Sequence, residues 1–370
     1  MGGREVTTHL LCSERNSSLR KLATVWQFRQ YTLTTRRGYM LQRLWRGNRM
    51  FGMLASVLLI LALFPSAVLA HDTGQVPTSF WESCSFEPVT ILSIGIAALW
   101  YAAGLRHLRR QPAGSTIVPN WRVAFYYIGL LILLLALVSP LHVYGELLIS
   151  VHMAQHMIMT MVAAPFLVLG DPLLVMLWAF PSNRRRTVAL QLSPRLLPHR
   201  LATWLFQPVV ALLLHLATIL IWHLPPLYQA AVHAEWVHYL QPATFCGTAL
   251  LFWWPVIETT PARRTMSYPM KLLYLFFAML FQTKLIGGML TFVSDTIYVH
   301  YAETAHLWNV TALDDQRLAG IFMLVGGFMM YMMAFTAVFF VWAHHASQHE
   351  PDNPPLPQTY QPATGQRQDV

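Results

Sequence analysis

Charged residues are scarce in this chain: Asp, Glu, Lys and Arg make up only 11% of its 370 residues, whereas 55% are hydrophobic. Soluble domains carry about 25% charged residues, so the composition excludes a wholly soluble protein. Several apolar runs reach the roughly 20 residues that a helix needs to cross a bilayer. The sequence therefore predicts an all-α fold, a polytopic bundle of helices embedded in a lipid bilayer.

Cysteine and enzyme signatures are also lacking. The three cysteines, Cys12, Cys84 and Cys246, form no Cys-x-x-Cys motif and allow at most one disulfide. The chain holds no Gly-x-Ser-x-Gly, His-Glu-x-x-His or phosphate-binding glycine motif, and no nucleophile with a base beside it. These absences predict a protein that is not an enzyme.

A basic surface is missing as well, despite a net charge of +9. The first 49 residues hold ten Lys and Arg, whereas from residue 71 onward 15 basic residues stand against 14 acidic ones. The body of the protein is therefore almost neutral, and we expect no nucleic-acid partner.

Residues 40–70 have the parts of a secretory signal peptide: a basic start, an apolar stretch, and Val68 and Ala70 before the cleavage point. We predict cleavage after Ala70, with an uncleaved anchor helix as the alternative. Residues 1–39 are interpreted as an upstream extension before a start at Met40, or as a disordered basic segment.

Seven membrane spans are predicted in the domain 71–343. They cover roughly residues 88–105, 121–139, 147–169, 203–222, 242–258, 269–292 and 319–343. The segment 172–200 is too charged to cross and predicts interfacial helices. The Pro-rich segment 344–370 predicts a disordered cytoplasmic tail.

The positive charges of the loops predict the orientation. The segments after the first, third and fifth spans carry twelve Lys and Arg, and those after the second, fourth and sixth carry only Arg317. Because basic loops stay in the cytoplasm, the mature N-terminus is predicted to face out, on the periplasmic side.

The third span contains the stretch VHMAQHMIMTM, residues 151–161. His152 and His156 are one turn apart and share a face, roughly 8 and 14 Å below the outer end of the span. Met153, Met157 and Met161 form an adjacent stripe at the same spacing. Imidazole with thioether is a ligand set for Cu(I), so this stretch predicts a copper site. The alternative is that the histidines form hydrogen bonds and the methionines fill the core.

Further histidines are predicted near the same depth. His215 lies about 10 Å below the outer end of the fourth span, and His223 and His238 follow near the outer surface. Lys284 lies in the outer half of the sixth span, where an unpaired ammonium costs several kcal/mol. We expect it to face the bundle and to pair with Glu146, Asp295 or a carbonyl.

Four stretches resemble a known family. HMAQHMIMTMVAAPFLVLGDPLL, WHLPPLYQAAVHAEWVHYLQ, ALLFWWPVIE and DDQRLAGIFMLVGG look like successive signatures of the seven-helix CtaG-type cytochrome c oxidase assembly factors. The resemblance runs from about residue 85 to 343. It implies a plasma-membrane protein that serves maturation of a haem–copper oxidase through copper delivery. The chain departs at Pro242, where a second histidine is expected four residues after His238.

Together these features predict a non-enzymatic assembly factor that accepts periplasmic Cu(I) and passes it to cytochrome c oxidase subunits. A periplasmic copper carrier is a further expected partner. Two alternatives are an inward copper transporter, and a haem protein in which His152 or His156 faces His215. The expected metal ligands are His152, His156, His215, Met153, Met157, His223 and His238.

Overall fold

The structure is a computed structural model of the chain, and it describes residues 84, 87–111, 114–181, 204–257, 266–302, 305 and 309–348. The predicted extension 1–39, the predicted signal segment 40–70 and most of the predicted interfacial and tail segments lie outside these residues. The last helix continues to Ser347, so the first residues of the predicted tail are helical.

Every element in the described ranges is a helix, which confirms the all-α prediction. Each of the seven predicted spans corresponds to a helical segment. These segments are α2 (Pro88–Arg109), α4 (Asn120–Val138), α6–η1–α7 (Ile149–Leu169), α11 (Pro208–Trp222), α13 (Glu235–Trp253), α14–η3–α15 (Tyr268–Phe292) and α16–η6–α17 (Ala312–Ser347). The shorter helices are α3 (Gly114–Ile117), α5 (Pro140–Leu147), α8 (Pro172–Leu177), α12 (Pro225–His233) and the 3₁₀ turn η4 (Val299–Ala302).

Five of these segments are long and apolar enough to cross a bilayer, namely α2, α4, α6–α7, α14–α15 and α16–α17. A sixth is obtained if α11 and α12, which are bent by 79°, count as one broken span. The predicted count of seven is therefore not confirmed. The segment outside the count is α13, whose first turns carry the polar residues His238, Gln241 and Thr244.

Sequence features explain where several helices begin. Proline opens α2, α5, α8, α11 and α12, because its ring has the helical φ and the first turn needs no N–H. Thr311 caps α16, as its hydroxyl accepts a hydrogen bond from the N–H of Asp314 at 3.1 Å. This cap agrees with the sequence, in which Thr311 precedes two aspartates.

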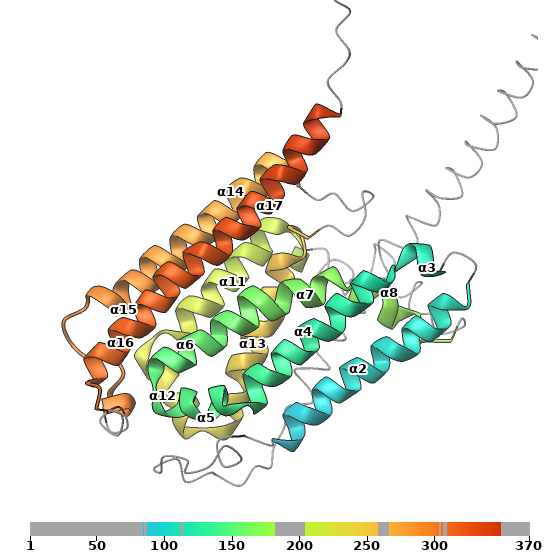
Figure 1. Ribbon diagram of the computed structural model, residues 1–370. Helices are drawn as coiled ribbons and strands as arrows, with labels where there is room; N and C mark the ends of the chain where they lie inside the picture. Colours follow the sequence, from blue (N-terminus) through green and yellow to red (C-terminus); the bar gives the residue numbers. More distant parts are fainter. Residues whose placement is uncertain are drawn as a thin grey trace, which may run out of the picture.

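The helices form one bundle (Figure 1). The pair α14–α15 and α16–α17 lies at one edge, α2 lies beside α4 at the other, and α6–α7, α11 and α13 lie between them. Glycine allows the close contact of the first pair: a Cβ on Gly287 would lie 2.9 Å from the backbone N of Leu324, and one on Gly320 would lie 2.3 Å from Oγ1 of Thr291.

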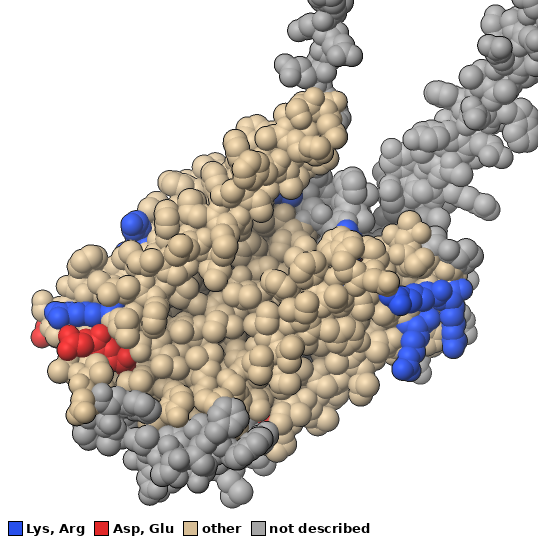
Figure 2. Space-filling model, viewed as in Figure 1, with Lys and Arg blue, Asp and Glu red and all other residues tan. Residues whose placement is uncertain are grey.

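Charged side chains gather near the two ends of the molecule on the face shown in Figure 2 and are sparse between them. Lys284 departs from this pattern, since it is exposed on η3 (Leu280–Gly287). The prediction that it faces the bundle and pairs is wrong: no partner occurs among the described residues. The reason is that Gln282, Thr283 and Ile286 occupy the side of the helix that packs inward.

Candidate metal centre

The helix that carries the VHMAQHM stretch is held by distant parts of the chain. It has no side-chain cap of its own; instead the carboxylate of Asp315, on α16, accepts hydrogen bonds from the N–H groups of Ile149 at 2.7 Å and Ser150 at 3.3 Å. A carboxylate satisfies donors that a helix N-terminus otherwise leaves unpaired. One turn beyond the histidines, Trp253 of α13 donates to the carbonyl of Thr160 at 2.8 Å. Both contacts fix the position of the histidine face.

His152 and His156 touch each other, as their predicted common face requires. Their Nε2 atoms are 2.8 Å apart, the distance of a hydrogen bond in which one ring donates and the other accepts. A tetrahedral ion with bonds of about 2.0 Å needs ligand atoms about 3.3 Å apart. A shift of about half an ångström would therefore open the pair to an ion. Nδ1 of His156 is buried and has no hydrogen-bond partner within the described residues.

The pair lies in a cavity of two adjoining parts, of about 20 Å³ and 80 Å³, which we call the histidine chamber. Glu146, His152, His238 and Gln241 line both parts. The smaller part also contains His142, His156 and Met159. The chamber lies at the end of the bundle that the charge pattern predicts to be periplasmic, beside α5 and the first turns of α2, α6 and α13.

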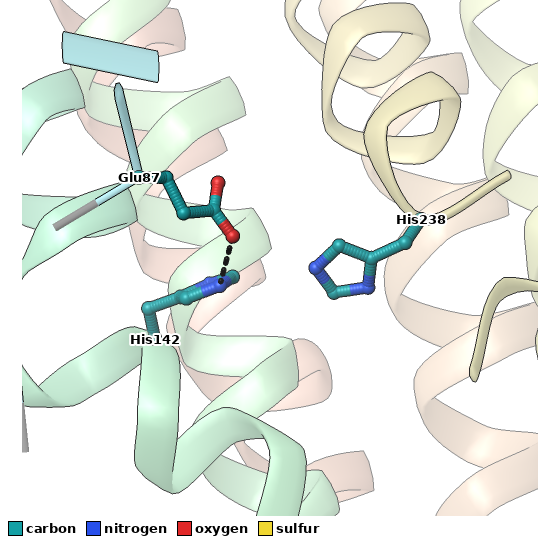
Figure 3. Close-up of side chains that lie close together, drawn as sticks. All are labelled: Glu87, His142 and His238. Carbon is teal, nitrogen blue, oxygen red and sulfur yellow. Dashed lines mark ion pairs between the residues drawn. The ribbon is translucent and has the colours of Figure 1, made fainter. Parts of the chain in front are cut away.

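Next to the pair, Glu87, His142 and His238 form a second cluster (Figure 3). One ligand atom from each lies within 4.8 Å of the others. Glu87 immediately precedes α2, His142 is on α5, and His238 points toward both from the first turn of α13. Nε2 of His142 is 3.6 Å from Oε1 of Glu87 and 3.8 Å from Oε1 of Glu146. Two carboxylates therefore face one imidazole.

Burial and charge act in opposite directions in this cluster, which lies outside the predicted spans. Burial alone would raise the pKa of Glu87, but its contact with His142 and the charge of His238 lower it below the usual range. Burial alone would lower the pKa of His142, because it disfavours the charged imidazolium. The negative charges of Glu87 and Glu146 outweigh burial, so the pKa of His142 is raised above its usual value. Gln155 opposes that charge, because its amide nitrogen donates to the carbonyl of Ala136 at 2.8 Å and faces Nδ1 of His142 at 3.1 Å. An amide donor on Nδ1 favours a neutral ring with its proton on Nε2.

Two of the predicted histidine ligands lie outside the chamber lining. His215 is fully buried, stacks on Phe252 with ring centroids 4.9 Å apart, and has Nδ1 3.4 Å from the hydroxyl of Thr248. His223 donates from Nδ1 to the carbonyl of Ile219 at 2.7 Å. The structure therefore brings His152, His156 and His238 into one chamber, whose lining includes neither His215 nor His223.

The methionines are divided in a similar way. Met153 and Met157 pack in a hydrophobic cluster with Ile219 and other apolar residues, and the Met157 methyl group lies against Gly326. Met159 lines the chamber instead. The sequence contained a sign of this position, because Met159 is seven residues after His152 and three after His156. Both spacings put Met159 on the same face of a helix as the two histidines.

Glu87 and His142 are site residues that sequence reasoning missed. Glu87 shows only as an acidic residue before a proline at a helix start, and His142 only as a histidine four residues before Glu146. Nothing in the local pattern connects either residue to His238, because the contact forms only when α2, α5 and α13 pack together.

The fold and this site define a class: a multi-pass helical membrane protein with a buried cluster of histidines at one end. The chain belongs to the family of cytochrome c oxidase caa3 assembly factors, whose sequence pattern matches residues 99–345. This result confirms the resemblance stated above, although the seven-helix detail is not confirmed.

Similar proteins occur in mycobacteria. Uncharacterized proteins of Mycobacterium bovis and Mycobacterium tuberculosis are each 29% identical to this chain over 260 residues, and one of Mycobacterium leprae is 27% identical over 262 residues. The matches cover 68% of this chain but 38% of each relative, so the chain spans less than half the length of these relatives. No solved structure matches the chain.

Proposed function

We propose that this protein is a non-catalytic factor in the assembly of a cytochrome c oxidase, and that it receives Cu(I) and passes it to oxidase subunits. Membership of the family supports the role in assembly. The observation that carries the copper proposal is the pair of His152 and His156 Nε2 atoms, which lie 2.8 Å apart in the histidine chamber, beside Met159.

The surroundings of the pair favour a monovalent ion. Each imidazole ring also packs against an aromatic ring. The centroids of His156 and Phe245 are 4.4 Å apart, and those of His152 and Tyr228 are 5.4 Å apart. Neutral nitrogen and sulfur ligands suit Cu(I). Bringing one positive charge into a poorly solvated site also costs far less than bringing two.

We further propose that the chamber opens to the periplasm and that a periplasmic copper carrier supplies it. The loop charges predict that the start of α2 lies outside, and Glu87 at that start belongs to the chamber end of the bundle. The opposite end of α2 carries Arg106, Arg109 and Arg110, which suit the cytoplasmic side of a bacterial inner membrane.

Haem binding has little support. The two parts of the chamber, about 20 Å³ and 80 Å³, are far smaller than the roughly 300–1,000 Å³ of ordinary small-molecule sites. His215, the partner expected for a bis-histidine haem, stacks on Phe252 and does not line the chamber. An ion with a few waters is the ligand that fits.

Cu(I) binding to the purified full chain tests the proposal. A competition titration with a chromophoric Cu(I) chelator should show that His152→Ala/His156→Ala weakens binding at least about 100-fold, because two ligands are lost. His107→Ala is the matched control, since His107 is an exposed histidine on α2. Unchanged Cu(I) affinity in the double variant would show that the histidines serve only packing.

A further inference from the structure

The cluster of Glu87, His142 and His238 has the donor set of a metal site in its own right. Its three ligand atoms lie within 4.8 Å, and a tetrahedral ion with bonds of about 2.0 Å would draw them to about 3.3 Å. The Glu87–His142 distance of 3.6 Å is already close to that value. Only His238 has to approach, from the opposite side of the gap seen in Figure 3.

A second observation also points to a ligand here. Nε2 of His142 is buried, faces the cluster and has no hydrogen-bond partner in the described part of the chain. Buried polar atoms are almost always satisfied, and the distances of 3.6 Å to Glu87 and 3.8 Å to Glu146 are ion-pair distances too long for a hydrogen bond. A bound ion would satisfy this nitrogen more closely than either carboxylate does. Oε1 of Glu146, 3.8 Å from the same nitrogen, is available as a fourth ligand.

The charges of the cluster select the kind of ion. Glu87 and Glu146 bring two negative charges, whereas the rings of His152 and His156 contact no carboxylate in the described structure. Two carboxylates balance a divalent ion, and mixed imidazole and carboxylate ligands suit Zn²⁺ or Cu²⁺. We propose that Glu87, His142 and His238 bind a divalent transition-metal ion, at a site distinct from the His152–His156 pair. This inference goes beyond the proposed function and does not depend on it.

The neighbours of the ligands orient them for this role. Thr90 donates to Oε2 of Glu87 at 3.0 Å, which leaves Oε1 to face His142. The backbone carbonyl of Ala231 interacts favourably with the ring of His238, and an N–H directed at this carbonyl would leave the other ring nitrogen for the ion. Contacts of this kind set the tautomer and direction of metal-binding histidines.

Gln155 adds a cost that limits how tightly the ion is held. A ring that binds metal through Nε2 carries its proton on Nδ1, and the Gln155 amide nitrogen now faces Nδ1 of His142. On loading, the amide has to turn its oxygen to this proton and give up its bond to the Ala136 carbonyl. The site is therefore suited to an ion that exchanges and less to a permanent structural ion.

Cobalt binding to the purified full chain tests the inference, because Co²⁺ reports its coordination by visible absorption and Zn²⁺ displaces it. We expect one Co²⁺ per chain at this site, displaced by Zn²⁺. Glu87→Gln should weaken binding at least about 100-fold, because loss of a direct ligand exceeds the 10- to 100-fold effect of an outer contact. Asp314→Asn, an exposed carboxylate on α16, is the matched control and should stay within about twofold.

Two comparisons keep the outcome decisive. His238→Asn should lose Co²⁺ as Glu87→Gln does, and helix content by circular dichroism should match that of the wild type in both. His152→Ala/His156→Ala should keep Co²⁺ binding even though it loses Cu(I), with a much smaller change in Co²⁺ affinity than Glu87→Gln causes, because the two sites share the chamber but no ligand. Wild-type Co²⁺ affinity in Glu87→Gln, or loss of Co²⁺ in the double histidine variant, would overturn the divalent site. Failure of Cu(I) binding alone would overturn only the copper proposal.

Discussion

The histidine chamber and the cavity beneath it differ sharply although they share a wall. Leu137, Met159 and Pro242 line both spaces. The second cavity, of about 90 Å³, lies between α2, α4, α8 and α13, and its described lining contains neither histidine nor carboxylate. Its soft groups are the sulfurs of Met159, Met176 and Cys246.

This contrast bears on the choice between delivery and transport. An ion entering the chamber meets imidazoles and carboxylates at once, but farther in it meets hydrocarbon with a few scattered sulfurs. Moving a charged ion into such surroundings is costly unless ligands accompany it. The arrangement favours a protein that takes up and releases metal on the same side of the membrane.

The largest effect is expected in cells that depend on the chamber. In a deletion strain complemented with His152→Ala/His156→Ala, oxidase activity at low copper should fall to the level of the deletion, while the variant still reaches the membrane. A site about 100-fold weaker needs about 100-fold more copper for equal occupancy, so added copper should restore part of the activity. Oxidase activity, transcript level and membrane content are the measurements. Normal activity in the deletion strain at low copper would rule out the role in assembly.

A smaller effect is expected on stability, from a substitution outside the histidine chamber that should leave Cu(I) affinity unchanged. A Cβ on Gly104 would lie 1.9 Å from the carbonyl oxygen of Val175, where α2 meets α8. Gly104→Ala should therefore destabilise the protein by about 1–3 kcal/mol through overpacking. Gly95→Ala, on the same helix with nothing within 4 Å of the added carbon, is the control and should change stability little. Thermal unfolding measures the difference. If Cu(I) affinity falls along with stability in Gly104→Ala, the two regions do not act independently.

The smallest effect is expected at the shared wall. Met159→Leu should weaken Cu(I) binding by at most about tenfold, because the thioether supplements two imidazoles and leucine fills a similar volume. Cys246→Ala, in the apolar cavity only, should leave Cu(I) affinity within about twofold. Both values come from the same chelator titration. A loss in Cys246→Ala as large as that caused by removing the histidines would extend the copper path inward and favour transport.

Much of the fold could be predicted from the sequence. Apolar runs located the helices because a span must satisfy its own backbone and contact lipid along its length. Prolines and Thr311 stand at helix starts for local reasons, and the one-turn spacing of His152 and His156 was enough to place both rings on one face. These features depend only on residues close together in the chain.

Other features required the packed structure. Lys284 turned outward because Gln282, Thr283 and Ile286 took the inward side, and hydropathy alone gives no such preference. Met159 and not Met153 faces the chamber, because Met153 packs with Ile219 on another side of α6. Both choices were decided by which neighbouring helix lies against each face.

The contrast is clearest at the candidate metal centre. The sequence by itself determined that a pair of imidazoles would meet inside a membrane helix, since a single helical turn joins them. Only the tertiary structure brought Glu87, His142 and His238 within 4.8 Å, because they come from three separate elements and no local periodicity relates them. The same packing stacked His215 on Phe252, away from the chamber lining. The depth of a residue in the membrane follows from counting along one helix, but its neighbours follow from how the helices pack.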